Sequence, residues 1–89
     1  MDFEWDESKA RRNEHKHGVT FHEATEVFGD DFSSCVLDPG HSRDEERYLL
    51  FGMSASGSHL VVSFTERANT IRIISARRMT PSERKAYEQ

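Results

Sequence analysis

The hydrophobic and polar positions of the first 29 residues predict two helices. Asp6 can accept hydrogen bonds from the free N–H groups at the start of the first helix, and Gly18 can end that helix. Thr20 and Glu23 form the capping-box pattern that opens a second helix, which Gly29 would stop. Apolar side chains recur at helical spacing in the second helix and should pack on a sheet: Phe21, Ala24, Val27 and Phe28.

Beyond residue 30 the chain changes to short apolar runs that are typical of β-strands. These runs cover residues 35–37, 47–53, 59–65 and 70–76. Because the connections between them are short, with the turn formers Asp38, Pro39 and Gly40 after the first run, we expect antiparallel neighbours. Residues 3–5 are a candidate fifth strand at one edge of this sheet.

A C-terminal helix is predicted by Thr80, Pro81 and Glu83, which combine a capping box with a proline at the first helical position. At this length there is room for one domain with one small core, spanning residues 1–89. The predicted fold class is therefore α+β: two N-terminal helices, an antiparallel sheet of four or five strands, and a C-terminal helix.

The last strand carries arginines on both of its predicted faces. Strict alternation would place Arg72, Ile74, Ala76 and Arg78 on one face and Ile71, Ile73, Ser75 and Arg77 on the other. At least one arginine must then lie near a packed or functional surface.

Charge is distributed unevenly along the chain, although the net charge is only −4. Residues 1–45 hold five basic and twelve acidic residues, whereas residues 46–89 hold seven basic and four acidic ones. The acidic total disfavours a general nucleic-acid coating protein, but the basic half can present a local phosphate-binding patch. The low hydrophobic content, 35%, implies a small core that a partner protein would help to stabilise.

The single cysteine, Cys35, cannot form an internal disulfide, which favours a reducing, cytoplasmic location. We expect this cysteine to be an inert core residue rather than a nucleophile. No apolar stretch is long enough for a signal peptide or a membrane span. The five histidines lack the spacing of metal ligands, so we expect neither a metal site nor a cofactor.

Motifs at both ends of the chain resemble the BrnT toxin family. In the first half the similar residues are Phe3-Glu4-Trp5-Asp6, Lys9, Asn13, Lys16-His17-Gly18-Val19, Phe21, Ala24 and Phe28. In the second half they are Glu46-Arg47-Tyr48, Gly52, Leu60-Val61-Val62, Arg67, the run from Ile71 to Arg78, Glu83-Arg84 and Tyr87-Glu88. One departure is Ser58-His59, where relatives often have Gly-Arg.

This resemblance implies a RelE-like fold and a ribonuclease that stops translation. It also implies a BrnA-like antitoxin with a ribbon-helix-helix segment, which would neutralise the chain in a hetero-oligomer and carry the contacts to DNA. RNA would then be the substrate. A second interpretation is a non-catalytic binding module that keeps the antitoxin interface but has lost cleavage, which the acidic balance and Ser58-His59 favour. Direct DNA binding by this chain is disfavoured by its negative charge.

Cleaving RNA without a metal requires a base, an acid and cations for the phosphate. Arginine suits the last role because its planar fork pairs two phosphate oxygens at once. The candidate catalytic arginines are Arg67, Arg72 and Arg77, and Arg78 and Arg84 are candidate RNA-binding residues. The alternative is a solvated strand edge with a few surface ion pairs.

The leading candidate for proton transfer is His17, whose position at a helix C-terminus favours the protonated form. Lys16, next to it, is a candidate RNA-binding residue. The alternative is that Lys16 and His17 only cap helix carbonyls and cover Trp5. Tyr87 is a candidate catalytic residue that could bond a phosphate or stack a base, or could simply pack on the sheet.

Two further alternatives concern polar residues. Asp6, Lys9 and Asn13 could form a network that orients His17, or a hydrated helix face. Glu46 could act as a general base, or form a surface ion pair with Arg47.

Overall fold

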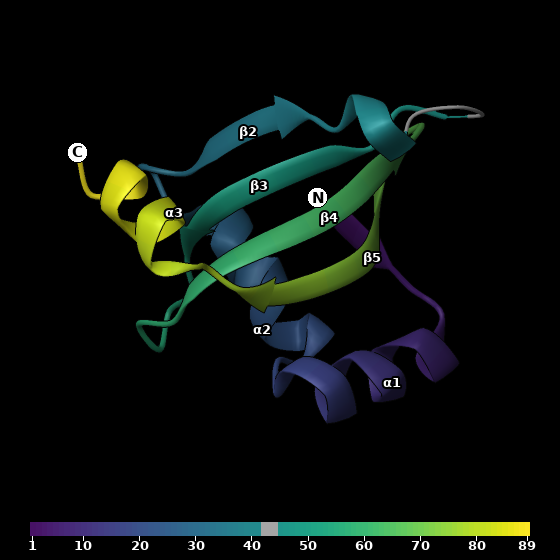
Figure 1. The fold of residues 1–89 in the computed structure, drawn as a ribbon. Helices are drawn as coiled ribbons and strands as arrows, with labels where there is room; N and C mark the ends of the chain where they lie inside the picture. Colours follow the sequence, from purple (N-terminus) through teal and green to yellow (C-terminus); the bar gives the residue numbers. More distant parts are fainter. Residues whose placement is uncertain (42–44) are drawn as a thin grey trace.

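The computed structural model describes residues 1–41 and 45–89 as one sheet with three α-helices (Figure 1). In chain order the elements are β1 (Asp2–Glu4), α1 (Glu7–His17), α2 (Phe21–Glu26), a 3-10 turn (Val27–Gly29), β2 (Ser34–Leu37), a second 3-10 turn (Pro39–His41), β3 (Tyr48–Met53), β4 (His59–Arg67), β5 (Thr70–Arg78) and α3 (Pro81–Tyr87). The predicted α+β class is confirmed. In the described residues no helix is both long and apolar enough to cross a membrane.

The five strands follow the order β1-β5-β4-β3-β2. Neighbours from β2 to β5 are antiparallel, as predicted, but β1 runs parallel to β5, with Glu4 opposite Arg72. The candidate edge strand at residues 3–5 is thus present, shifted by one residue to Asp2–Glu4. Because it pairs in parallel, the sheet is mixed. β1 and β5 can pair in parallel because the long segment between them, which includes α1 and α2, allows the chain to cross over.

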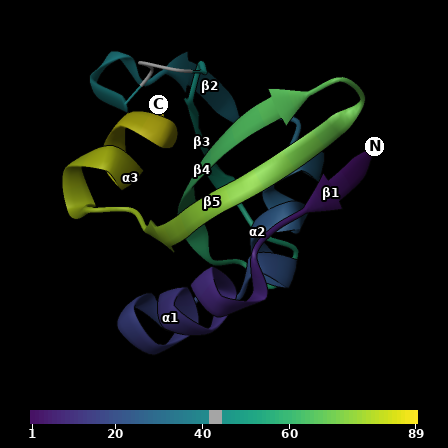
Figure 2. The ribbon, with the colours of Figure 1, turned by 90° about the vertical axis from the view of Figure 1, so that its right-hand side faces the viewer.

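Helices α1 and α2 cover one face of the sheet, and α3 lies at the other (Figures 1 and 2). Phe28 of the 3-10 turn makes edge-to-face contacts with Phe3 and Phe64, with ring centroids 5.1 and 5.0 Å apart. The buried cluster between helices and sheet consists of Val19, Phe21, Ala24, Val27, Leu50, Leu60, Val62, Phe64, Ile71, Ile73 and Ala76. The apolar stripe predicted for α2 thus packs on the sheet.

Helix ends follow the predicted caps, with two changes. The second helix is α-helical only to Glu26 and continues as the 3-10 turn to Gly29, the residue at which it was predicted to end. Asp6 accepts a hydrogen bond from Lys9 N at 3.1 Å, and Gly18 ends α1 with a left-handed φ of 69°. Thr20 Oγ1 accepts from Glu23 N at 3.0 Å, but the Glu23 carboxylate does not complete the predicted capping box. It accepts hydrogen bonds from two serines of the β3–β4 turn instead, which tie that turn to α2.

Asn13 of α1 is buried, and its side chain makes hydrogen bonds to the backbone of β5 that a neighbouring strand would otherwise make. Its side chain accepts from Ala76 N at 3.1 Å and donates to Ala76 O at 2.9 Å and to Val19 O at 3.0 Å. Because β1 ends opposite Arg72, Ala76 would otherwise have no partner on that edge. Asn13 is therefore a structural residue and not part of a hydrated helix face.

The prediction that Cys35 lies in the core is wrong. All four residues of β2 are exposed, Cys35 included. The reason is that β2, a terminal strand, lies beyond the buried cluster, to which none of its residues contributes.

Candidate active site

A bulge in β5 decides which arginines share a face. Ser63 is paired with Ser75, but the next residue, Phe64, is paired with Ile73, so Ile74 is an extra residue. The prediction that Arg72 shares a face with Arg78 is therefore wrong. Arg72 and Arg77 lie instead on one face, together with Thr65 and Arg67 of β4; we call it the arginine face. It is opposite the face that α1 and α2 cover.

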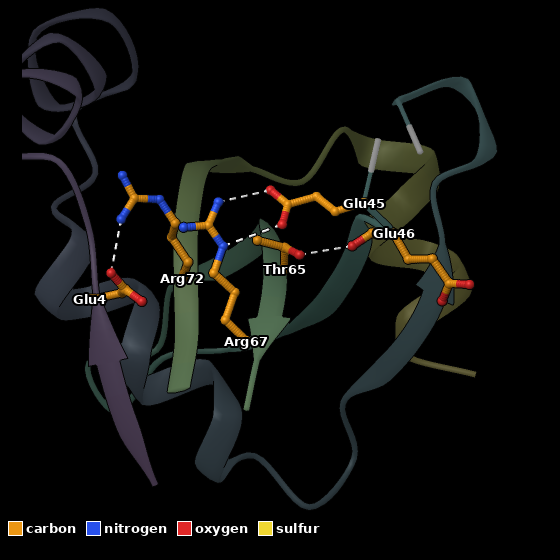
Figure 3. Close-up of polar contacts among 6 residues, drawn as sticks. All are labelled: Glu4, Glu45, Glu46, Thr65, Arg67 and Arg72. Carbon is orange, nitrogen blue, oxygen red and sulfur yellow. Dashed lines mark hydrogen bonds and ion pairs between the residues drawn. The ribbon is translucent and has the colours of Figure 1, made fainter. Parts of the chain in front are cut away.

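Two ion pairs lie side by side at one end of this face (Figure 3). Arg72 Nη1 is 3.0 Å from Glu4 Oε2 of β1. Arg67 makes two hydrogen bonds to Glu45, from Nε at 3.2 Å and from Nη2 at 3.0 Å. The hydrogen bond from Arg67 lowers the pKa of the Glu45 carboxyl, and the charge of Arg72 lowers it further. We call these four residues the double ion pair.

The segment that carries Glu45 is fixed to the sheet. Thr65, which is buried, donates a hydrogen bond from Oγ1 to the carbonyl oxygen of Glu46 at 2.9 Å (Figure 3). The Glu46 carboxylate accepts a hydrogen bond from the hydroxyl of Tyr48 at 2.7 Å. Glu46 therefore anchors this segment. These contacts are structural and do not support its predicted role as a general base.

At the other end of the arginine face, Arg77 joins β5 to α3. Its guanidinium donates to both carboxylate oxygens of Glu83, at 2.8 and 3.0 Å. Glu83 also completes the predicted capping box of α3, accepting from Thr80 N at 2.9 Å. The hydrogen bonds from Arg77 lower the pKa of Glu83 to about 2.

Tyr87 packs at the border of the same face. Its hydroxyl donates a hydrogen bond to Asp30, which raises the pKa of Tyr87 to about 12, so the phenol stays protonated at neutral pH. The ring of His59 lies edge-on to it, with centroids 5.6 Å apart. A groove of about 380 Å³, the α3 groove, is lined by Ser34, Val36, Phe51, Ser82, Glu83, Ala86 and Tyr87.

The remaining predicted residues lie outside this arrangement. His17 is half-buried in the last turn of α1, and its imidazole makes no hydrogen bond or ion pair with another described residue. Lys16 is exposed beside it. Arg78 projects from the opposite face, 3.5 Å from Ser58 Oγ, and Arg84 of α3 pairs with Glu88 at 3.2 Å.

Sequence reasoning missed the acidic partners of the arginines and the neighbours of Tyr87. Glu4 and Arg72 are separated by 68 positions, so no local pattern connects them. The same holds for Asp30 and Tyr87, which are 57 positions apart. In the described part of the chain, no three His, Cys, Asp or Glu side chains gather in a way that could hold a metal ion.

Comparison with known proteins identifies the family. Residues 5–83 match the family described as the ribonuclease toxin BrnT of type II toxin–antitoxin systems. The chain belongs to the BrnT family. A similar solved structure is the 1.1 Å crystal structure of the Brucella abortus ribonuclease toxin BrnT, with a TM-score of 0.66 and 23% identity over 90% of this chain and 97% of that one. No curated protein matches the chain.

Membership in the BrnT family implies a ribonuclease toxin with an antitoxin partner. The matched residues include Arg67, Arg72 and Arg77, whereas Glu4 and Tyr87 fall outside the match. The TM-score of 0.66 shows that the chain shares the fold of the Brucella protein.

Proposed function

We propose that this BrnT-family chain is a metal-independent endoribonuclease that stops translation by cleaving RNA on its arginine face. The observation that carries the proposal is the bulge at Ile74, which brings Arg72 and Arg77 to the face that also holds Arg67. Guanidinium groups from two adjacent strands can then grip a phosphate chain from one side.

The reaction is an internal transfer at phosphorus. The ribose 2′-oxygen forms a bond to phosphorus, the bond from phosphorus to the 5′-oxygen breaks, and a base and an acid move one proton each. Arg67, Arg72 and Arg77 stabilise the charge that builds on the phosphate oxygens. The products are a 2′,3′-cyclic phosphate and a 5′-hydroxyl.

Tyr87 and His17 are the candidate proton-transfer residues. The phenol of Tyr87 keeps its proton at neutral pH, so it would act as a hydrogen-bond donor or acid rather than as a base. His17 comes from α1, which packs beside β5, and it would need RNA that extends around that edge. Lys16, Arg78 and Arg84 would bind flanking phosphates.

The antitoxin we propose is BrnA-like, with a ribbon-helix-helix segment that supplies the contacts to DNA. The chain would act in the cytoplasm, where both RNA and the antitoxin are available. Neutralisation would require the antitoxin to cover the arginine face or to block the approach of RNA to it.

A second candidate function is a non-catalytic antitoxin-binding module. One observation favours it: Arg67, Arg72 and Arg77 each pair with a carboxylate of the same chain. A phosphate would have to displace these carboxylates. The Arg67–Glu45 pair, whose side chains are 51% and 40% exposed, contributes only about 0–1 kcal/mol, so an RNA that makes several contacts could displace this carboxylate.

Expression without the antitoxin separates the two functions. An active ribonuclease arrests growth and degrades cellular RNA, and Arg72→Ala or Arg77→Ala relieves the arrest. Arg12→Ala is the matched control, because Arg12 is exposed on α1, away from the arginine face, and should remain toxic. Harmless expression of folded wild-type protein would instead support the binding module.

A further inference from the structure

Strand β2 is an edge of the sheet, and all four of its residues are exposed. It is the terminal strand, and none of its four residues, Ser34 to Leu37, is charged or a proline. Proteins usually protect such edges with lysine, proline or a bulge, because free backbone groups recruit another strand. The edge is also apolar: Val36 and Leu37 are 45% and 47% exposed, and Phe32, just before the strand, is 82% exposed.

The free backbone groups of β2 can be identified. Asp38 N donates to Arg47 O of the segment before β3, at 2.8 Å. Since hydrogen-bonding directions alternate along a strand, Val36 and Ser34 also face β3. The N–H and C=O groups of Cys35 and Leu37 therefore point away from the sheet, where an added strand would meet them.

A pocket for a side chain adjoins this edge. Ser34 and Val36 form one wall of the α3 groove, and Ala86 and Tyr87 of α3 form the opposite wall. A strand laid along β2 would alternate its side chains between the two sheet faces and so direct one of them toward this groove. Backbone pairing and one apolar anchor would then act together.

We propose that the antitoxin docks on β2 as an added strand and places an apolar side chain in the α3 groove. This inference rests on the proposed antitoxin partnership and specifies its surface. The side chain in the α3 groove would lie beside Glu83, the partner of Arg77, and would therefore restrict the access of RNA to that end of the arginine face.

The family selects the antitoxin over a second copy of this chain. The chain belongs to a family of toxins from type II toxin–antitoxin systems, and such a toxin has an antitoxin as its partner. The side chain that fits the α3 groove is apolar, because Val36, Phe51 and Ala86 are among the residues that line it.

The only cysteine of the chain reports directly on this edge. Cys35 is exposed, so a maleimide at mildly alkaline pH should modify it in the purified chain. In the complex with the co-expressed antitoxin, modification should slow about tenfold or more. The control is Ser8→Cys in a Cys35→Ser chain; Ser8 is exposed on α1, and its rate should not change.

A proline variant tests the backbone contact. Leu37→Pro removes an N–H that points away from β3, so the fold is retained, whereas antitoxin affinity should fall about tenfold or more. Leu37→Ala is the matched control, because it loses the same side chain but keeps the N–H, and it should bind more tightly than the proline variant.

The outcomes separate this inference from the antitoxin partnership itself. A stable complex with Cys35 as reactive as in the free chain overturns docking on β2 and leaves the partnership standing. Failure of the wild-type pair to form a complex overturns both. Protection of Cys35 that grows with concentration of the chain alone would assign β2 to self-association and also overturn the proposal.

Discussion

The arginines of the arginine face are held by carboxylates in geometries that a phosphate could also adopt. Arg67 and Arg77 each offer two N–H groups to two oxygens of one acid, which is the way a guanidinium grips a phosphate. The acids thus keep the guanidinium groups ordered while RNA is absent. Binding of RNA would be an exchange of one set of oxygens for another.

The Arg77–Glu83 pair should make stability depend on pH in the acid range. Glu83 has a pKa of about 2 in the fold against an ordinary 4.5. The stabilisation is therefore complete above pH 4.5 and is lost as pH falls toward 2, where the folded chain takes up the proton.

In Glu83→Gln the urea midpoint should depend less on pH across this window, while α3 persists because glutamine also completes a capping box. Glu14→Gln, at an exposed position of α1, should keep the wild-type profile. A Glu83→Gln profile that superimposes on the wild type would show that the pair contributes nothing.

The buried amide of Asn13 predicts a large effect of a small substitution. Asn13→Ala leaves Ala76 N–H, Ala76 C=O and Val19 C=O without their partner, and should lower the free energy of unfolding by about 2–4 kcal/mol in urea denaturation. Lys16→Ala, on the exposed side of the same helix, should change it by less than about 0.5 kcal/mol. Equal effects of the two substitutions would contradict the strand-like role of Asn13.

Among the elements, helix α3 is attached to the sheet through few contacts. Glu83, in its first turn, bonds Arg77, and Tyr87, its last residue, bonds Asp30. Tyr87→Phe loses the hydroxyl but keeps the ring. The free energy of opening of α3 should fall by about 1 kcal/mol, so its amide hydrogens should exchange faster. Exchange in α1 should not change, and unaltered exchange in α3 would show that the hydroxyl does not anchor it.

Local signals explain why the helices could be predicted from the sequence. The caps at Asp6, Gly18 and Thr80 depend on neighbours within a few residues, and each is found in the structure. Strand positions were also predicted closely, because apolar runs and turn formers are local. The Glu23 carboxylate was misassigned because the serines that bind it lie more than 30 positions away.

Features set by pairing between distant segments could not be predicted. The bulge at Ile74 is a choice of register between β4 and β5, and strict alternation therefore assigned Arg72 and Arg77 to different faces. The apolar run at Cys35 has the same composition whether its strand is central or terminal. Only the strand order shows that it is exposed.

In the whole molecule the two faces of the sheet serve different purposes. Helices α1 and α2 bury the core on one face, so stability resides there. The arginine face extends from Arg67, which pairs with Glu45, to Arg77, which pairs with Glu83 of α3, and β2 lies next to α3 (Figure 1). Substrate and antitoxin would therefore approach neighbouring surfaces of one small domain.

Cleavage of RNA by the purified chain in the presence of a metal chelator tests the central claim most directly. The wild type and Arg12→Ala should cut RNA at equal rates and leave 2′,3′-cyclic phosphate ends, whereas Arg72→Ala and Arg77→Ala should each be slower by about a hundredfold or more, as expected when a cation is removed from a developing charge. Equal cleavage by all four proteins, or cleavage that the chelator abolishes, would contradict the account.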